Sequence, residues 1–226
     1  AVISGQKAYN GVAILSRLPI EDVQVGLAAL LPDDAKASGL GEQKRLISAR
    51  IEGLRVLNLY VPNGSSLSSE KYAYKLEWLA CLKRYLKAQE ASGEPLVMVG
   101  DFNIALEDRD IHDPARLSGG IMASEPEREA LLAALGERLE DGFRLFEPES
   151  GHWSWWDYRT AGWEAGRGWR IDHIYLDAEL REQALGCTID AQQRGNLQPS
   201  DHAPVIINLA WPPHDGDDED NEDGDL

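Results

Sequence analysis

Acidic, amide and imidazole side chains stand at the ends of three apolar runs, each about as long as a β-strand. Buried carboxylates are rare unless they pair with a cation or bind a metal ion, so three such ends indicate a chemical site. Carboxylate and amide oxygens suit Mg²⁺, and a carboxylate or imidazole can activate water for attack on a phosphodiester. The residues concerned are Asp101, Asn103, Asp172, Asp201 and His202.

Two of these residues also have a plain structural interpretation. An aspartate that follows a glycine often forms an Asx turn at the end of a strand, which alone would account for Asp101. Asp172 stands inside the apolar run 170–176, where a buried salt bridge would explain it. The elements around these residues, and the other motifs, decide between the two interpretations.

The run from Leu96 to Val99 positions the first group. It is uninterrupted and apolar and lies between Pro95 and Gly100, which is typical of a strand buried on both faces. Gly100 lets the backbone turn, so the following Asp101 falls just past the carboxyl end of the strand. Open α/β sheets bind their ligands at that edge.

Periodicity and turn signals predict the other elements. Apolar residues at three- and four-residue spacing indicate a helix from Ser69 to Gln89. A second helix begins at Ser124, because Ser124 and Glu127 form a capping box. The buried face of that second helix is expected to carry Leu131, Leu132, Leu135 and Leu139. Further strands are expected at residues 9–17, 45–51, 54–61, 170–176 and 203–209.

Composition limits the class of protein. With 226 residues and 43% hydrophobic content, the chain can form one large core, and we assign residues 1–211 to a single domain. It has no apolar run of 18 or more residues, so no membrane interaction is expected. Cys81 and Cys187 stand far apart and outside any Cys-x-x-Cys pair, which predicts a reducing, cytoplasmic setting.

The charge of the chain is strongly acidic. A formal net charge of −17 argues at first against a polyanionic partner. Eight of the acids, however, stand in residues 214–226 without any Lys or Arg, and we predict a disordered acidic tail at 212–226. That tail would act as a solubiliser or, alternatively, as a mimic of DNA. Nucleic-acid binding then depends on local basic patches.

Several blocks of the sequence resemble the exonuclease III branch of the endonuclease/exonuclease/phosphatase superfamily, which includes abasic-site endonucleases. The blocks occur in family order and cover everything but the tail. They are 9–13, 59–64, 100–103, 153–159, 167–173 and 199–205. The resemblance implies an α/β fold, a four-layered sandwich of two packed mixed sheets flanked by helices. It also implies DNA phosphodiester hydrolysis with Mg²⁺, or with Mn²⁺ in its place.

Roles for individual residues follow from the same resemblance. Asp101 would activate water or protonate the leaving group, Asn103 would steady the transition state, and Asp172 would orient His202 on the phosphate. Tyr60 would place its hydroxyl on the phosphate. The implied metal ligands are Asp101, Asn103, Asp201 and His202. The implied DNA contacts are Tyr9, Asn10, Trp155, Arg159 and Arg170, with Trp155 walling a pocket for an extruded sugar or nucleotide.

The family pattern normally begins about fifty residues earlier, with an Asn-bearing strand and a glutamate that ligates Mg²⁺. These blocks are absent, so the expected fold lacks its first strand and helix, and we expect chain 1–226 to be a weak or inactive nuclease. The expected partner is duplex DNA with abasic sites or 3′ ends, and the expected state is a monomer. Two alternatives stay open: a phosphoesterase acting on a non-DNA substrate, and a non-catalytic nucleic-acid or protein-binding module.

Overall fold

The computed structural model describes residues 1–7 and 10–212. Its core element is a six-stranded mixed sheet in the order β3-β4-β5-β6-β8-β7. The β5–β6 pair is parallel and the other neighbours are antiparallel. The strands of this sheet are β3 (Glu21–Val25), β4 (Leu46–Ile51), β5 (Leu54–Tyr60), β6 (Leu96–Asp101), β7 (Glu140–Asp141) and β8 (Asp172–Leu176).

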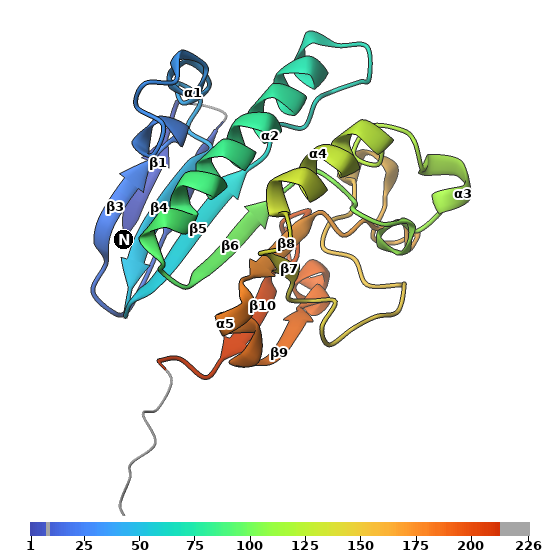
Figure 1. Ribbon diagram of the computed structural model, residues 1–226. Coiled ribbons are helices and arrows are strands. Elements are labelled where there is room, and N and C mark those ends of the chain that lie inside the picture. Colours follow the sequence, from blue (N-terminus) through green and yellow to red (C-terminus); the bar gives the residue numbers. More distant parts are fainter. Residues whose placement is uncertain (8–9, 213–226) are drawn as a thin grey trace, which may run out of the picture.

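Two helices cover one face of this sheet (Figure 1). They are α2 (Glu70–Gln89) and α4 (Glu125–Leu135). Alternate residues of β5 and β6, such as Leu57 and Met98, pack with Trp78 and Leu131 of these helices in the largest apolar cluster. The shorter helices are α1 (Ala35–Leu40), α3 (Pro114–Leu117) and α5 (Ala178–Glu182). Single 3₁₀ turns occur at Leu27–Ala29, Glu90–Ser92, Asp108–Asp110, Tyr158–Thr160 and Ala191–Gly195.

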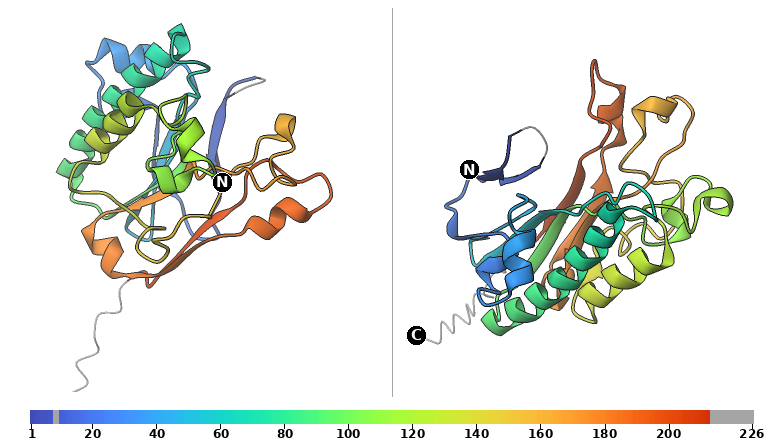
Figure 2. Two further views of the ribbon diagram at one scale, coloured as in Figure 1. Left: turned by 90° about the vertical axis from the view of Figure 1, so that its right-hand side faces the viewer. Right: turned by 90° about the horizontal axis from the view of Figure 1, so that it is seen from above.

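The opposite face is covered by two separate antiparallel pairs (Figure 2). One pair is β1 (Val2–Gly5) with β2 (Gly11–Ile14), and the other is β9 (Ala184–Ile189) with β10 (Val205–Leu209). Val12 packs on Ile47 of β4, whereas Cys187 packs on Ile174 of β8. The α/β class and the helix-flanked mixed sheet are confirmed, and the expected second sheet takes the form of these two pairs.

Two further predictions concern the acidic tail and membrane-spanning segments. The acidic tail lies outside the described residues except for Pro212, so the domain boundary at residue 211 stays a prediction. Within residues 1–7 and 10–212, no helix is both long and apolar enough to cross a membrane.

Gly100 stands at a point of close approach between β6 and β5. Its φ angle is +144°, and a Cβ atom at this position would lie 1.9 Å from the backbone oxygen of Leu59. We expect Gly100→Ala to lower the free energy of unfolding by more than about 4 kcal/mol, because two backbones would have to separate. Gly93→Ala is the matched control: its φ is +67° with open space around it, and it should cost about 1–2 kcal/mol. Urea unfolding measures both, and equal losses would contradict the argument.

Candidate active site

The register of the central sheet brings Asp101 and Asp172 together. Asp101 is the last residue of β6, Asp172 is the first of β8, and the two are direct antiparallel partners. Partners of this kind share one face of a sheet, so two like charges meet there. Burial, and then the charge of Asp172, raise the pKa of Asp101 to about 7, against the lowering effects of His202 and of the Asn103 N–H.

Asn103 is fixed to Asp101 by two hydrogen bonds. Its backbone N–H donates to Asp101 Oδ1 at 2.8 Å, and its Nδ2 donates to Asp101 Oδ2 at 3.1 Å and to the Val61 carbonyl at 3.0 Å. The φ of Asn103 is +50°, a left-handed conformation that asparagine tolerates. The Asx turn foreseen as the structural interpretation is therefore present, and it also aims the amide oxygen at Asn63, whose Nδ2 donates to it at 2.8 Å.

A three-residue chain of hydrogen bonds holds His202. Its Nδ1 lies 2.8 Å from Asp172 Oδ2 and 3.1 Å from Oδ1, and Ser154 Oγ donates to the same Oδ2 at 2.7 Å. Burial lowers the pKa of His202, but the hydrogen bond and charge of Asp172, with the charges of Asp101 and Asp201, raise it to about 9. The predicted pairing of Asp172 with His202 is confirmed in its geometry.

The loop bearing Asp201 is tied to the tryptophan-rich segment. Trp155 Nε1 donates to Asp201 Oδ2 at 3.0 Å, and the Trp156 N–H donates to the Asp201 carbonyl at 3.0 Å. The Trp155 ring centre lies 6.4 Å from that of His202. Trp155 is therefore beside the imidazole, as expected of a residue that walls the site.

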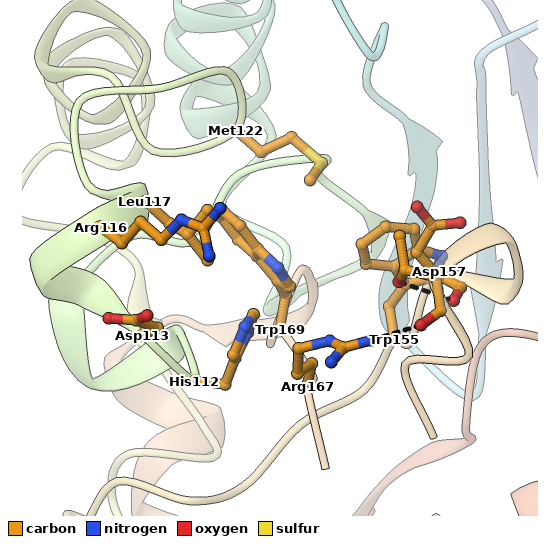
Figure 3. Close-up of a pocket in the computed structure, with 10 residues that line it drawn as sticks. His112, Asp113, Arg116, Leu117, Met122, Trp155, Asp157, Arg167 and Trp169 are labelled. Atoms are coloured by element: carbon orange, nitrogen blue, oxygen red, sulfur yellow. Dashed lines mark hydrogen bonds between the residues drawn. The ribbon is translucent and has the colours of Figure 1, made fainter. Parts of the chain in front are cut away.

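A cavity of about 480 Å³ opens next to this cluster. Trp155 and Trp169 form apolar walls, and Met122, Arg116 and Arg167 project toward the same space (Figure 3). The cavity thus combines flat apolar surfaces with cationic side chains.

Tyr60 and Asn10 share a second hollow of about 660 Å³, which Asn63 and Arg45 also line. Tyr60 ends β5 and is the register partner of Asp101, while the Arg45 guanidinium carbon lies 4.7 Å from the centre of its ring. The role of Tyr60 on the phosphate stays a prediction. Tyr9, a further predicted contact, lies outside the described residues.

Two predicted DNA contacts stand apart from the cluster. The Arg159 side chain is 94% exposed at the surface, and its Nε lies 4.0 Å from Asp157 Oδ1. The prediction for Arg170 needs correction, because this residue is 1% exposed. Its guanidinium donates to Asp110 at 2.7 Å and to Asp141 at 2.6 Å. A buried guanidinium that binds two carboxylates is not available to a phosphate.

This correction predicts the effect of Arg170→Ala. Removing one partner from a buried ion pair leaves uncompensated charge, so the free energy of unfolding should fall by about 3–5 kcal/mol. The salt dependence of DNA affinity in the folded fraction should not change. Arg167→Ala, on the exposed rim of the cavity, should instead keep stability and reduce the salt slope by about one. Chemical unfolding and affinity titrations over salt distinguish the two; a reduced slope for Arg170→Ala would restore the first assignment.

The residues present can supply part of a metal site. Within the described part of the chain, no three His, Cys, Asp or Glu side chains are grouped to enclose a metal ion. Mg²⁺ does not need such a cage, because it keeps several waters and binds through one or two carboxylates and phosphate oxygens. Asp101 offers hard oxygen donors of this kind. The Asn103 amide turns its nitrogen toward Asp101 and its oxygen toward Asn63, so it would have to rotate to ligate a metal beside Asp101. His202 fits the role less well, because a protonated imidazole has no lone pair for a metal.

Sequence reasoning assigned no role to Ser154 and Asn63. Ser154 is fully buried, and besides donating to Asp172 it accepts the Asp172 N–H at 3.0 Å. The position of Ser154, a small polar residue between tryptophans, could have indicated a role in the site. Asn63 was missed because it precedes a glycine, and an Asn-Gly pair is already explained by a turn.

The chain is similar in sequence and structure to several known proteins. Residues 2–202 match the Endonuclease/Exonuclease/phosphatase family. Exodeoxyribonuclease III of Haemophilus influenzae is 35% identical over 213 residues, which is 89% of this chain and 77% of that protein. The 3′ phosphatase NExo from Neisseria, solved with a product DNA hairpin, is 40% identical with a TM-score of 0.84, and the match covers 93% of this chain and 79% of that chain. An AP endonuclease from Archaeoglobus fulgidus is 37% identical with a TM-score of 0.84, and the match covers 92% of this chain and 78% of that chain.

Proposed function

This chain belongs to the endonuclease/exonuclease/phosphatase family, and we propose that it is a metal-dependent hydrolase of DNA phosphoesters acting at 3′ ends or abasic sites. The supporting observation is the Asp172–His202 pair, 2.8 Å apart, set beside the Asp101–Asn103 corner. The relatives named above are an exodeoxyribonuclease, a 3′ phosphatase and an AP endonuclease. This proposal replaces the alternatives of a non-DNA phosphoesterase and a binding-only module.

Asp101 is suited to accept a proton from the attacking water. Its pKa is about 7 in the metal-free protein, and a bound cation would lower that value. The assignment therefore rests on position, because the carboxylate ends β6 directly opposite Asp172. The water oxygen bonds to phosphorus, its proton passes to Asp101, and the bond from phosphorus to the 3′ oxygen breaks. That oxygen then takes a proton from solvent. Asn103 holds the carboxylate in place through its two hydrogen bonds.

His202 is suited to stabilise the negative charge that grows on the phosphate oxygens. Its pKa of about 9 keeps the imidazole protonated at neutral pH. Since Nδ1 is held by Asp172, Nε2 is the donor left for a phosphate oxygen. Bound Mg²⁺, or Mn²⁺, held by Asp101 with Asp201 as a proposed further ligand, would supply further positive charge to the same oxygens.

The cavity between Trp155 and Trp169 is suited to receive the sugar or terminal nucleotide next to the scissile bond. Aromatic walls hold a base or a sugar by stacking and shape, without reading sequence. Arg167 at the rim can contact the adjacent phosphate. A cytoplasmic setting and a monomeric state are part of the proposal; Cys81 and Cys187 are both buried and free of disulfides, which is compatible with a reducing compartment.

A substrate panel tests the proposal. Three labelled duplexes, carrying an abasic-site analogue, a 3′ phosphate or an unmodified 3′ end, are incubated with the protein in Mg²⁺ or in EDTA and resolved on a denaturing gel. A soluble phosphodiester serves as the comparison substrate. We expect weak cleavage of at least one duplex, dependent on Mg²⁺, with little action on the soluble ester; the weak rate follows from the absent glutamate ligand. Equal cleavage of the soluble ester, or undiminished cleavage in EDTA, would refute the proposal.

A further inference from the structure

A lysine and a glutamate are buried together directly behind the catalytic corner. Lys75 of α2 and Glu127 of α4 both have fully buried side chains, and Lys75 Nζ lies 2.5 Å from Glu127 Oε1. Taking two charges out of water is costly, and an apolar pair of similar volume often gives equal or greater stability. Stability alone therefore does not account for an ion pair at this place.

The other two donors of Lys75 reach the residues of the site. Nζ donates to the backbone carbonyl of Asn103 at 2.8 Å and, over a longer distance of 3.4 Å, to that of Asn63. An ammonium group has three donors, so Glu127 and the two carbonyls use them all. Lys75 thus holds the peptide groups of two asparagines that stand far apart in the sequence.

The side chains of these two asparagines form a chain of hydrogen bonds that ends at Asp101. The Asn63 amide donates to the Asn103 amide oxygen at 2.8 Å, and the Asn103 amide donates to Asp101 Oδ2 at 3.1 Å. Their backbones are fixed from inside by one ammonium group, and their side chains are aligned one after another toward Asp101. A displacement of either carbonyl would be passed to the carboxylate.

Glu127 extends the network to the wall of the cavity. Its Oε1 also accepts the Met122 N–H at 3.2 Å, and its Oε2 accepts the Ser124 N–H at 3.1 Å. Met122 lines the cavity beside Trp155 and Trp169. One buried ion pair therefore sets the position of the catalytic corner relative to the cavity wall.

We propose that Lys75 is a positioning residue for hydrolysis: held by Glu127, it fixes the Asn63 and Asn103 carbonyls so that the amide chain orients Asp101. This inference rests on the proposed function, since it assigns to Asp101 the reaction described above. Lys75 is too deeply buried to touch a substrate, so its effect is expected on the catalytic step and not on DNA binding.

Two double variants separate positioning from stability. Lys75→Met/Glu127→Gln removes both charges and leaves no donor toward the asparagines, while the glutamine can still cap α4. Lys75→Gln/Glu127→Gln is identical except that it restores an N–H donor one atom short of the ammonium. Lys83→Met, an exposed site on the same helix, is the control. Urea unfolding, kcat and KM on a cleaved duplex, and the Asn63 and Asn103 side-chain amide NMR signals are measured for each.

The expected result is a folded methionine double variant with kcat lowered on the order of 100-fold, as misplacement by about 1 Å can produce, and with KM changed less than about threefold. Both amide signals should shift, and the glutamine double variant should recover part of kcat. Lys83→Met should resemble the unsubstituted protein.

A kcat within about threefold of the unsubstituted value in the folded methionine variant would overturn the proposal. Should that variant not fold, the glutamine variant decides: loss of kcat with native amide signals would also overturn it, whereas shifted signals with a lowered kcat would support it. If the unsubstituted chain cleaves no duplex, the proposed function fails. The amide signals of the ligand-free protein still test the positioning.

Discussion

Replacing Asp101 with asparagine is expected to lower the rate constant for DNA hydrolysis by about 10⁴-fold, the upper end of what a general base supplies. The substitution keeps the shape of the side chain and one acceptor for Asn103. It removes the group that takes the proton from water, and it removes a negatively charged oxygen ligand from the proposed metal site. Both losses act on the same step, which places the expected effect at the top of the range.

The same substitution should change how stability depends on pH. The pKa of Asp101 is raised from an ordinary 3.8 to about 7 in the folded, metal-free protein. Between those values the folded protein retains a proton that the unfolded chain has lost. Stability therefore falls as pH rises from about 4 to 7, and this group causes no further fall above that. The amide that Asp101→Asn introduces cannot ionise, so the variant should lose this part of the slope.

Single-turnover cleavage and urea unfolding between pH 4 and 8 measure the two effects in metal-free and Mg²⁺-supplemented buffer. Asp33→Asn makes the same change at an exposed position and should alter neither the rate nor the slope. A variant that stays within about tenfold of the unsubstituted rate would show that Asp101 is not the base. An unchanged dependence of stability on pH would show that the pKa of Asp101 is not raised in the folded protein.

Sequence reasoning predicted well the features that have local causes. Ser69 caps α2 through its side chain, and Ser124 with Glu127 forms the predicted capping box of α4. The run from Leu96 became β6, with Gly100 in the positive-φ conformation that lets the chain approach β5. In each case the deciding interactions lie within a few residues of one another, so the pattern in the chain carries them.

The pairing of buried charges could not be predicted in the same way. Arg170 was expected at the DNA surface, yet it binds Asp110 and Asp141 inside the protein. Lys75 belongs to an amphipathic helix, where a lysine normally marks the solvated face, yet it is buried against Glu127. The partners are 29 to 60 residues away along the chain. No local pattern shows which charges will meet across that separation.

Burial within α4 was also predicted incompletely. Leu131 and Leu135 are buried as expected, whereas Leu132 is 53% exposed. The helix ends at Leu135, and Gly136 follows as its cap, so Leu139 is buried from a position beyond the helix. The width of a helix's buried face depends on what packs against it, here α2 and the central sheet, and the spacing of leucines does not contain that information.

Replacing Asp172 with asparagine should weaken catalysis through His202. Without the carboxylate, burial is left to lower the pKa of His202, and only the charges of Asp101 and Asp201 oppose it. The pKa should fall from about 9 toward the ordinary value near 6.5, so the imidazole becomes mostly neutral at about pH 7.5 and loses its preferred orientation. We expect a rate loss of about 10²- to 10⁴-fold at that pH, similar to the loss when a carboxylate that orients a catalytic histidine is made neutral.

An NMR titration of the His202 ring, assigned with His202→Gln, and single-turnover rates from pH 5.5 to 9 test this expectation. Asp201→Asn is the comparison, because the Asp201 charge is the weakest of the groups that raise the His202 pKa, and it should move that pKa less. The ratio of the Asp172→Asn rate to the unsubstituted rate should rise as pH is lowered, since protonation restores the positive charge of the imidazole, while protonation of Asp101 slows both proteins. A His202 pKa that stays near 9 would show that Asp172 does not hold the imidazole charged, and a flat ratio of variant to unsubstituted rates over pH would show that the charge is not what catalysis requires.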